Sequence, residues 1–264
     1  MKKVAKTFIA GLMALGLNFF PSKAESKTLE ELSLSDYPSP MMIQINPRSD
    51  FGAELDSNIF TKRFFYGIKL EDSLTWQNSL GISYGNFAFN FFNNRDLERG
   101  IWTKRGVLFS ISERIKGNII GAIGISGYDL RTEEFASAKK SIFDWLLFNE
   151  REVYAGAILN SPPLYPAVFY HRLFGRGHGY YVQANVTKRH SLNEMLRLDL
   201  GLETGYHKDM YVEEPGFNHV GFRSEMLTNM GWNITATPSF NFLFYPEKKE
   251  IELYYGLNVR YELK

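Results

Sequence analysis

The sequence predicts an all-β protein that forms a transmembrane antiparallel up-and-down β-barrel of about 12 strands. Apolar and polar residues alternate with period two in segments of about ten residues, as in a strand with one face toward lipid and one toward a lumen. No apolar run after the N-terminal region is long enough for a membrane helix. The 22 Phe, 15 Tyr, 4 Trp and 22 Gly also suit strands and aromatic girdles better than helices.

Residues 1–24 have the organisation of a secretory signal peptide. Three lysines come first, an uncharged apolar stretch covers 7–20, and Ala24 closes a short segment typical of a cleavage site. A retained membrane helix is the alternative, but about 14 apolar residues fall short of the roughly 20 that span a bilayer. We therefore expect cleavage of this segment and export to the bacterial outer membrane.

The alternation is clearest in three stretches of the C-terminal half. Residues 196–206 place leucines opposite charged residues and glycines, 232–244 place aromatics opposite Asn, Thr and Ser, and 251–263 alternate in the same way. A soluble β-sandwich also alternates, but its polar face meets bulk water and favours Lys, Glu and Thr. Here the polar face mixes Gly, Asn, Tyr and both charge signs, which favours a barrel lumen.

Extended along the chain, the pattern predicts twelve strands. They cover 51–70, 74–84, 86–93, 103–114, 118–129, 151–159, 164–173, 179–188, 194–206, 217–228, 231–245 and 250–263. Turn residues fill the short connections at one end, which we expect to be periplasmic, whereas the longer connections fall at the other end. Residues 25–50 alternate weakly and contain several Pro and Ser. They are expected to form a periplasmic leader before a barrel domain of 51–264.

Several stretches carry a resemblance to known proteins. They are Phe64 to Ile68, Gln77 with 80–84, 86–94, 151–156, 165–170 with 179–181, 198–202 and 237–240. These stretches resemble outer-membrane porin families, including the TorF-type porins, over most of the chain beyond the leader. The resemblance is a pattern of strands without an active-site signature, and it implies an outer-membrane location and a barrel fold more strongly than a function.

The C-terminus carries a second resemblance. Gly256, Val259, Tyr261 and Leu263 are spaced like the signal that outer-membrane barrels present to their assembly machinery. Leu263 replaces the usual final aromatic residue, and Lys264 follows it. The resemblance implies that the barrel assembly machinery is a partner of this chain.

No pattern in the sequence indicates an enzyme, and neither a metal nor a cofactor is expected. The chain has no Cys, and its five histidines lack a short metal-ligand spacing. Ser224 lies near His219 and Glu225 in sequence, but the period-two rule places Ser224 on the opposite face from both. The glycine-rich run at 175–179 lacks the ending of a phosphate-binding loop. A net charge of +1 gives no electrostatic case for nucleic acid.

Alternation sends one set of polar side chains toward the predicted lumen, all from the last four strands. The set comprises Arg197, Asp199, Glu203, His219, Arg223, Glu225, Glu252, Asn258, Arg260 and Glu262. Polar groups in a lumen need partners or water. They therefore either line a wet path or pair into a closed network that stabilises a narrow barrel, and the sequence leaves both readings open.

The longest predicted loop, 130–150, ends in a hydrophobic cluster that contains Ile142, Phe143, Asp144 and Trp145. Such a cluster is costly when exposed to water. It either folds into the barrel mouth as a constriction or extends strands into the outer aromatic girdle. The second reading is slightly favoured.

Together these observations predict a passive diffusion channel for small hydrophilic solutes, embedded in outer-membrane lipid, with selectivity set by a mixed-charge lumen. A non-conducting barrel with a structural or adhesive role is the alternative from a different class. A membrane hydrolase is the third reading. The sequence names neither a solute nor an oligomeric state.

Overall fold

The computed structural model describes residues 48–65, 68–130, 150–175, 178–209 and 216–263. The predicted signal peptide and nearly all of the predicted leader lie outside the described residues. The predicted constriction residues Ile142, Phe143, Asp144 and Trp145 also lie outside them. Among the described residues, no helix is long and apolar enough to cross a membrane.

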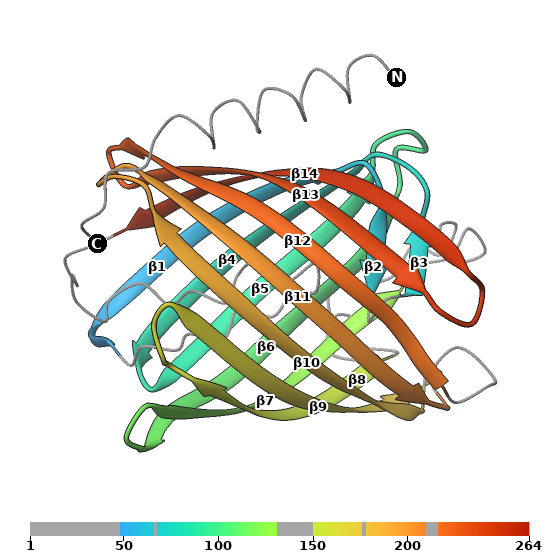
Figure 1. The fold of residues 1–264 in the computed structure, drawn as a ribbon, viewed down its shortest axis with the longest axis horizontal. Coiled ribbons are helices and arrows are strands. Elements are labelled where there is room, and N and C mark those ends of the chain that lie inside the picture. The colour runs from blue at the N-terminus through green and yellow to red at the C-terminus, as the bar shows by residue number, and fades with distance from the viewer. Residues whose placement is uncertain (1–47, 66–67, 131–149, 176–177, 210–215, 264) are drawn as a thin grey trace, which may run out of the picture.

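Twelve antiparallel strands close into one barrel, which confirms the predicted fold class and strand number (Figure 1). They are β1 (Arg48–Phe60), β4 (Thr75–Gly85), β5 (Phe87–Asp96), β6 (Trp102–Lys116), β7 (Ile119–Leu130), β8 (Glu150–Leu159), β9 (Leu164–Gly175), β10 (Gly179–Ser191), β11 (Leu196–Lys208), β12 (Gly216–Gly231), β13 (Ile234–Tyr245) and β14 (Glu250–Leu263). Each strand pairs with its sequence neighbours, and β1 pairs with β14 to close the ring. Closure leaves no unpaired edge in the sheet that these twelve strands form, as a backbone in lipid requires.

The predicted first strand, 51–70, is wrong beyond residue 60. The barrel strand β1 ends at Phe60, and two short strands, β2 (Arg63–Phe65) and β3 (Ile68–Glu71), form a separate two-stranded sheet. The alternation rule fails here because consecutive apolar residues at 64–66 assign no face. The other eleven predicted strands agree with the structure to within three residues at each end.

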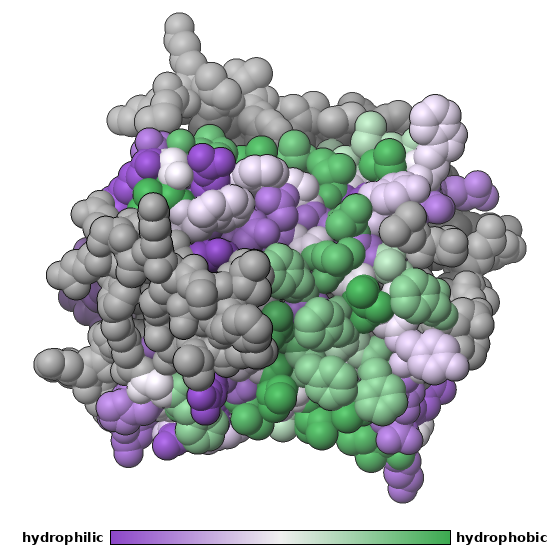
Figure 2. All heavy atoms as spheres, turned by 180° about the vertical axis from the view of Figure 1, so that it is seen from behind, coloured by the Kyte–Doolittle hydropathy of each residue, from purple (hydrophilic) through white to green (hydrophobic). Residues whose placement is uncertain are grey.

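The outward face of the barrel is apolar over a broad band. Large exposed side chains recur at every second position of the strands, among them Leu55, Leu80, Ile82, Phe89, Phe109, Ile123, Ile125, Val153, Val168, Leu202, Phe222, Leu253, Leu257 and Val259. Figure 2 shows hydrophobic side chains gathered into one contiguous patch on the wall seen from behind. Such a patch is unfavourable in water and is suited to lipid contact.

The two ends of the barrel differ. At the end where β1 begins and β14 ends, the connections are short, and Gly85 and Gly117 take the positive φ of 57° and 56° that tight turns require. The opposite end carries the longer connections, including the β2–β3 sheet. We name the first the short-turn end and the second the long-loop end. Their difference matches the periplasmic and extracellular ends of outer-membrane barrels.

Candidate functional site

The inward face of the barrel is divided into two walls of different chemistry. The charged wall consists of inward side chains from β10 to β14 and from β1, and the aromatic wall consists of inward side chains from β5 to β10. Both arise from the same period-two alternation, because residues at every second position turn away from the apolar outer face. The composition of the inward positions, not the backbone, makes the walls different.

Arg260 joins β14 to β1 inside the charged wall. Its Nε donates to Oδ1 of Asp56 at 2.8 Å and lies 4.0 Å from Oε2 of Glu54. Asn258, two residues before Arg260, donates to the same Asp56 oxygen at 3.3 Å. The Asp56 side chain is 3% exposed, so Arg260 supplies a cation to a carboxylate that has little access to water.

A second group of ion pairs lies on β10, β11 and β12. Asp199 lies 3.0 Å from Nε of Arg197 and 3.6 Å from Nε of Arg189, so one carboxylate is shared by two guanidinium groups. On β12, Arg223 Nε lies 3.4 Å from Glu225 Oε1. Arg189 also lies over the ring of Tyr165, 4.6 Å from its centroid, and this cation–π contact joins the charged wall to the aromatic wall.

Toward the long-loop end, two carboxylates of the charged wall are contacted by a histidine and by a lysine. His219 Nε2 lies 3.2 Å from Glu203 Oε1. Lys62, which lies between β1 and β2, donates to Glu252 of β14 and forms an ion pair with Asp72 at 3.3 Å. Partial burial lowers the pKa of Lys62, but the hydrogen bonds and charges of Glu252 and Asp72 outweigh burial and raise it overall. The contacts connect the β2–β3 region to the barrel.

All ten predicted lumen residues occupy inward positions of β11, β12 and β14. Asp199, His219, Glu225 and Arg260 are buried, and the remaining six are half-buried. The structure does not place the ten in a single cluster. Nine of them, all except Glu262, form the separate contacts described above, several of which involve partners from β1 and β10. Whether they line a solute path stays a prediction.

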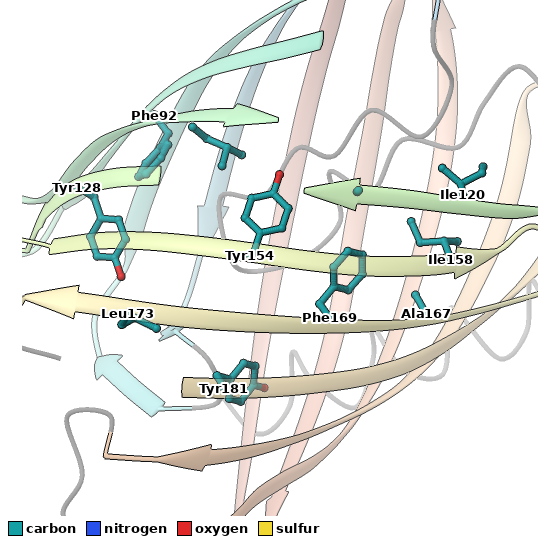
Figure 3. Packing of buried hydrophobic residues seen from close by; sticks show 11 residues of the cluster. Phe92, Ile120, Tyr128, Tyr154, Ile158, Ala167, Phe169, Leu173 and Tyr181 are labelled. Atoms are coloured by element: carbon teal, nitrogen blue, oxygen red, sulfur yellow. The ribbon is translucent and has the colours of Figure 1, made fainter. Parts of the chain in front are cut away.

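The aromatic wall was not predicted from the sequence. It is a buried cluster of eleven side chains, namely Phe92, Leu108, Ile120, Ala122, Tyr128, Tyr154, Ile158, Ala167, Phe169, Leu173 and Tyr181 (Figure 3). None of these side chains is more than 4% exposed. A short signal was available, because the inward positions of 154–156 read Tyr and Gly, and those of 165–169 read Tyr, Ala and Phe.

Inward glycines make room for the aromatic rings. Gly106 pairs with Phe92, Gly124 with Tyr154, and Gly156 with Phe169 across neighbouring strands. A Cβ atom at any of these glycines would overlap the ring of its partner. The rings therefore lie against the backbone of the adjacent strand.

Charged side chains also occur within the aromatic wall. Lys104 is 1% exposed, and its Nζ lies 4.1 Å from the ring centroid of Tyr128 and 5.2 Å from that of Phe92. His171 Nδ1 lies 2.8 Å from Glu152 Oε1. Neither Lys104 nor Glu152 was predicted as a lumen residue, because the set of inward charges was drawn only from the last four strands.

The geometry does not assemble a nucleophilic triad around Ser224. Ser224 pairs with Leu200 and Phe240 in an outward-facing row, while His219 is buried on the inward face. Within the described part of the chain, no three His, Asp or Glu side chains are arranged to hold a metal ion. What the inward face does offer is a set of fixed charges beside a packed aromatic surface.

The sequence matches no protein-family model and no curated protein. Solved structures share its fold. A structure described as "KdgM porin" matches with a TM-score of 0.55 at 12% identity, over 80% of this chain and 99% of that one. The structure described as "KdgM porin in complex with disordered oligogalacturonate" matches with a TM-score of 0.52 at 11% identity, over 81% of this chain and 99% of that one. The structure described as "NanC porin structure in rhombohedral crystal form" matches with a TM-score of 0.50 at 12% identity, over 80% of this chain and 100% of that one.

At these identities the likeness establishes the fold. The chain is a closed, antiparallel, 12-stranded barrel that resembles membrane porins. Membership of the TorF-type porin family stays a prediction.

Proposed function

We propose that this protein is a passive channel for small hydrophilic solutes in the bacterial outer membrane, reached by cleavage of residues 1–24 and insertion by the barrel assembly machinery. The observation that carries the proposal is the partial water contact of the charged wall. The side chains of Arg197, Glu252 and Glu203 are 19%, 16% and 15% exposed, whereas the aromatic wall is almost completely buried. A hydrated path would therefore follow the charged wall.

The packing of the aromatic wall supports an open bore. Rings that lie over glycines of the neighbouring strand occupy less of the barrel cross-section than rings that point toward its axis. Phe169 over Gly156 and Tyr154 over Gly124 are the clearest cases. The same rings give the wall a rigid surface, which would hold the charges opposite them at a fixed separation.

A related fold that binds a hydrophilic oligomer supports the solute class. The KdgM porin was solved in complex with disordered oligogalacturonate, which is a hydrophilic and acidic saccharide. The likeness between that protein and this chain is one of fold. Small hydrophilic solutes are therefore the class that we carry over, and the charge of the solute has to be argued from the residues of this chain.

Those residues favour cationic or neutral solutes over acidic ones. Among the described strands, the buried or half-buried inward carboxylates are Glu54, Asp56, Asp96, Glu150, Glu152, Asp199, Glu203, Glu225, Glu252 and Glu262. The corresponding inward lysines and arginines are Lys104, Arg189, Arg197, Arg223 and Arg260. Ten carboxylates against five cations leave the inward face net negative, and a bore with a net negative wall concentrates cations.

A non-conducting structural or adhesive barrel is the second candidate. The observation that favours it is the extent of pairing, because Arg260, Asp199, Glu203 and Glu225 all have ion-pair partners inside the barrel. In this reading, the ion pairs and the aromatic wall close the bore and stabilise the barrel.

Single-channel recording separates the two candidates. The chain lacking residues 1–24 would be folded in detergent, checked for β-structure by circular dichroism, and added to a planar bilayer. Discrete and reproducible conductance steps support the channel. The absence of steps from protein shown to be folded and inserted would overturn the channel and leave the non-conducting barrel.

A further inference from the structure

The outward face of β8 to β11 has an unusual charge pattern. These four strands lie side by side in the barrel (Figure 1). None of the outward positions of the four strands carries a carboxylate. Lysine and arginine occur there only near the two ends, with leucine, valine, alanine and tyrosine residues between them. Basic residues that flank an apolar band are suited to the headgroup regions of a bilayer.

Three basic residues gather on this face at the long-loop end. Arg172 of β9 is directly opposite Tyr180 of β10, and Tyr180 is directly opposite Lys208 of β11. Arg151 of β8 pairs with Phe174, two residues beyond Arg172 on the same face. Directly opposite residues have Cβ atoms about 5 Å apart and diagonal ones about 7–8 Å. Arg172 and Lys208 therefore flank Tyr180, and Arg151 lies diagonal to Arg172 on the next strand; we name these three basic residues the basic rim.

The side chains of the basic rim are available to a ligand. Arg151, Arg172 and Lys208 are all exposed, and none of them pairs with a carboxylate of the described chain. Arg172 instead lies over the ring of Phe174, 5.9 Å from its centroid, which holds the guanidinium against the wall. Among the described residues, the charge is thus held outside the barrel without a counter-ion.

Tyrosine rings lie directly beside the basic rim. Tyr170 stacks on Tyr180 with ring centroids 5.9 Å apart, and Tyr180 contacts Tyr206 with centroids 6.2 Å apart. Tyrosines concentrate where the hydrocarbon region meets the headgroups, because the ring is apolar and the hydroxyl is polar. The row of Tyr170, Tyr180 and Tyr206 therefore places the basic rim at the depth of the lipid headgroups, where the phosphate groups of lipids lie.

We propose that the basic rim binds the phosphate groups of a phosphorylated glycolipid in the outer leaflet. Arginine and lysine donate charge-assisted hydrogen bonds to phosphate oxygens, and the tyrosine row contacts the first part of the acyl chains. The long-loop end selects the outer leaflet, because outer-membrane barrels turn their longer loops outward. The inference depends on membrane insertion of the barrel and is independent of whether the barrel conducts.

The test compares retention of two lipids that differ only in phosphate. The chain lacking residues 1–24, folded in detergent, is mixed with bisphosphorylated lipid A or with the same lipid after enzymatic removal of both phosphates. Bound lipid is then counted by native mass spectrometry. We expect retention of the phosphorylated form to exceed that of the dephosphorylated form by about tenfold or more, and the ratio to fall as salt is added. Equal retention of the two lipids by the unmodified chain would overturn the proposal without any variant.

Variants then locate the site. The triple variant Arg151→Gln, Arg172→Gln and Lys208→Gln should lower the phosphate-dependent ratio to about one. The matched control removes three exposed positive charges from the short-turn end, by Arg114→Gln, Lys116→Gln and Lys188→Gln. The control should keep the ratio of the unmodified chain. Equal losses in the two triple variants would show that net charge alone attracts the lipid, and the proposed site would then be wrong.

Discussion

The ring of Phe169 lies over Gly156 on the inward face of the barrel. The two residues are directly opposite each other on β9 and β8, and a Cβ atom at position 156 would overlap the ring. The φ of Gly156 is not in the left-handed region, so its backbone conformation does not require glycine. Packing against the ring of Phe169 requires it instead.

Gly156→Ala should destabilise the barrel by about 1–3 kcal/mol, because the ring of Phe169 has to leave its position. The free energy of unfolding would be measured by urea titration of the barrel in lipid vesicles. Gly201→Ala is the matched control, since the nearest atoms to a new Cβ there lie at 3.7 Å, an ordinary contact distance. Equal effects of the two substitutions would show that the ring does not depend on the glycine.

Arg260→Gln should destabilise the barrel by about 3 kcal/mol, because it leaves the Asp56 carboxylate buried without its cation. The double variant Asp56→Asn and Arg260→Gln removes both charges and should recover more than half of the loss. Urea titration of Arg260→Gln, of Asp56→Asn and of the double variant, each compared with the unmodified chain, forms a double-mutant cycle. Additive effects would mean that Arg260 and Asp56 do not interact in the folded barrel.

The free energy of unfolding of Tyr128→Leu should be lower than that of Tyr128→Phe by about 0.5–2 kcal/mol. The phenylalanine keeps a ring at 4.1 Å from the Lys104 ammonium, whereas the leucine removes it. Thermal unfolding followed by circular dichroism measures both variants. If the leucine variant is as stable as the phenylalanine variant, the cation–π contact contributes nothing to stability.

The channel should pass cations more readily than anions. In a planar bilayer with a gradient of KCl, the sign of the reversal potential reports the preference directly. Glu203→Gln should lower the ratio of cation to anion permeability, while Arg223→Gln should raise it, because the first removes a negative and the second a positive inward charge. A preference for anions in the unmodified chain would contradict the charge balance of the inward face.

While Glu252 and Asp72 are ionised, Lys62 should contribute to stability below its ordinary pKa of 10.5 and lose that contribution as the pH rises through its raised pKa. A raised pKa means that the folded state binds the proton of Lys62 more tightly than the unfolded state does. The contacts of Lys62 with Glu252 and Asp72 therefore stabilise the folded state while Lys62 is protonated. The difference in unfolding free energy between the unmodified chain and Lys62→Met should therefore be constant between about pH 6 and 9. Urea titrations at several pH values check this. A difference that changes across this range would mean that another group titrates with Lys62.

Much of the fold was predictable because strand alternation is a local property. The leucines at 196–202 and the charges between them assign inward and outward faces without knowledge of any partner strand. The same rule failed at 64–66, where consecutive apolar residues assign no face. The candidate site was predictable only in part: alternation placed Arg197 and Arg260 on the inward face, but it could not supply their partners.

The sequence by itself determined the class of fold, the number of barrel strands and the inward or outward face of the side chains wherever apolar and polar residues alternate, because period two is set by the backbone of a single strand. Only the tertiary structure decided which inward groups meet. Asp56 and Arg260 are 204 positions apart, and they come together because β1 closes the barrel against β14. The division into a charged and an aromatic wall also depends on the circular order of the strands, which determines which inward residues become neighbours.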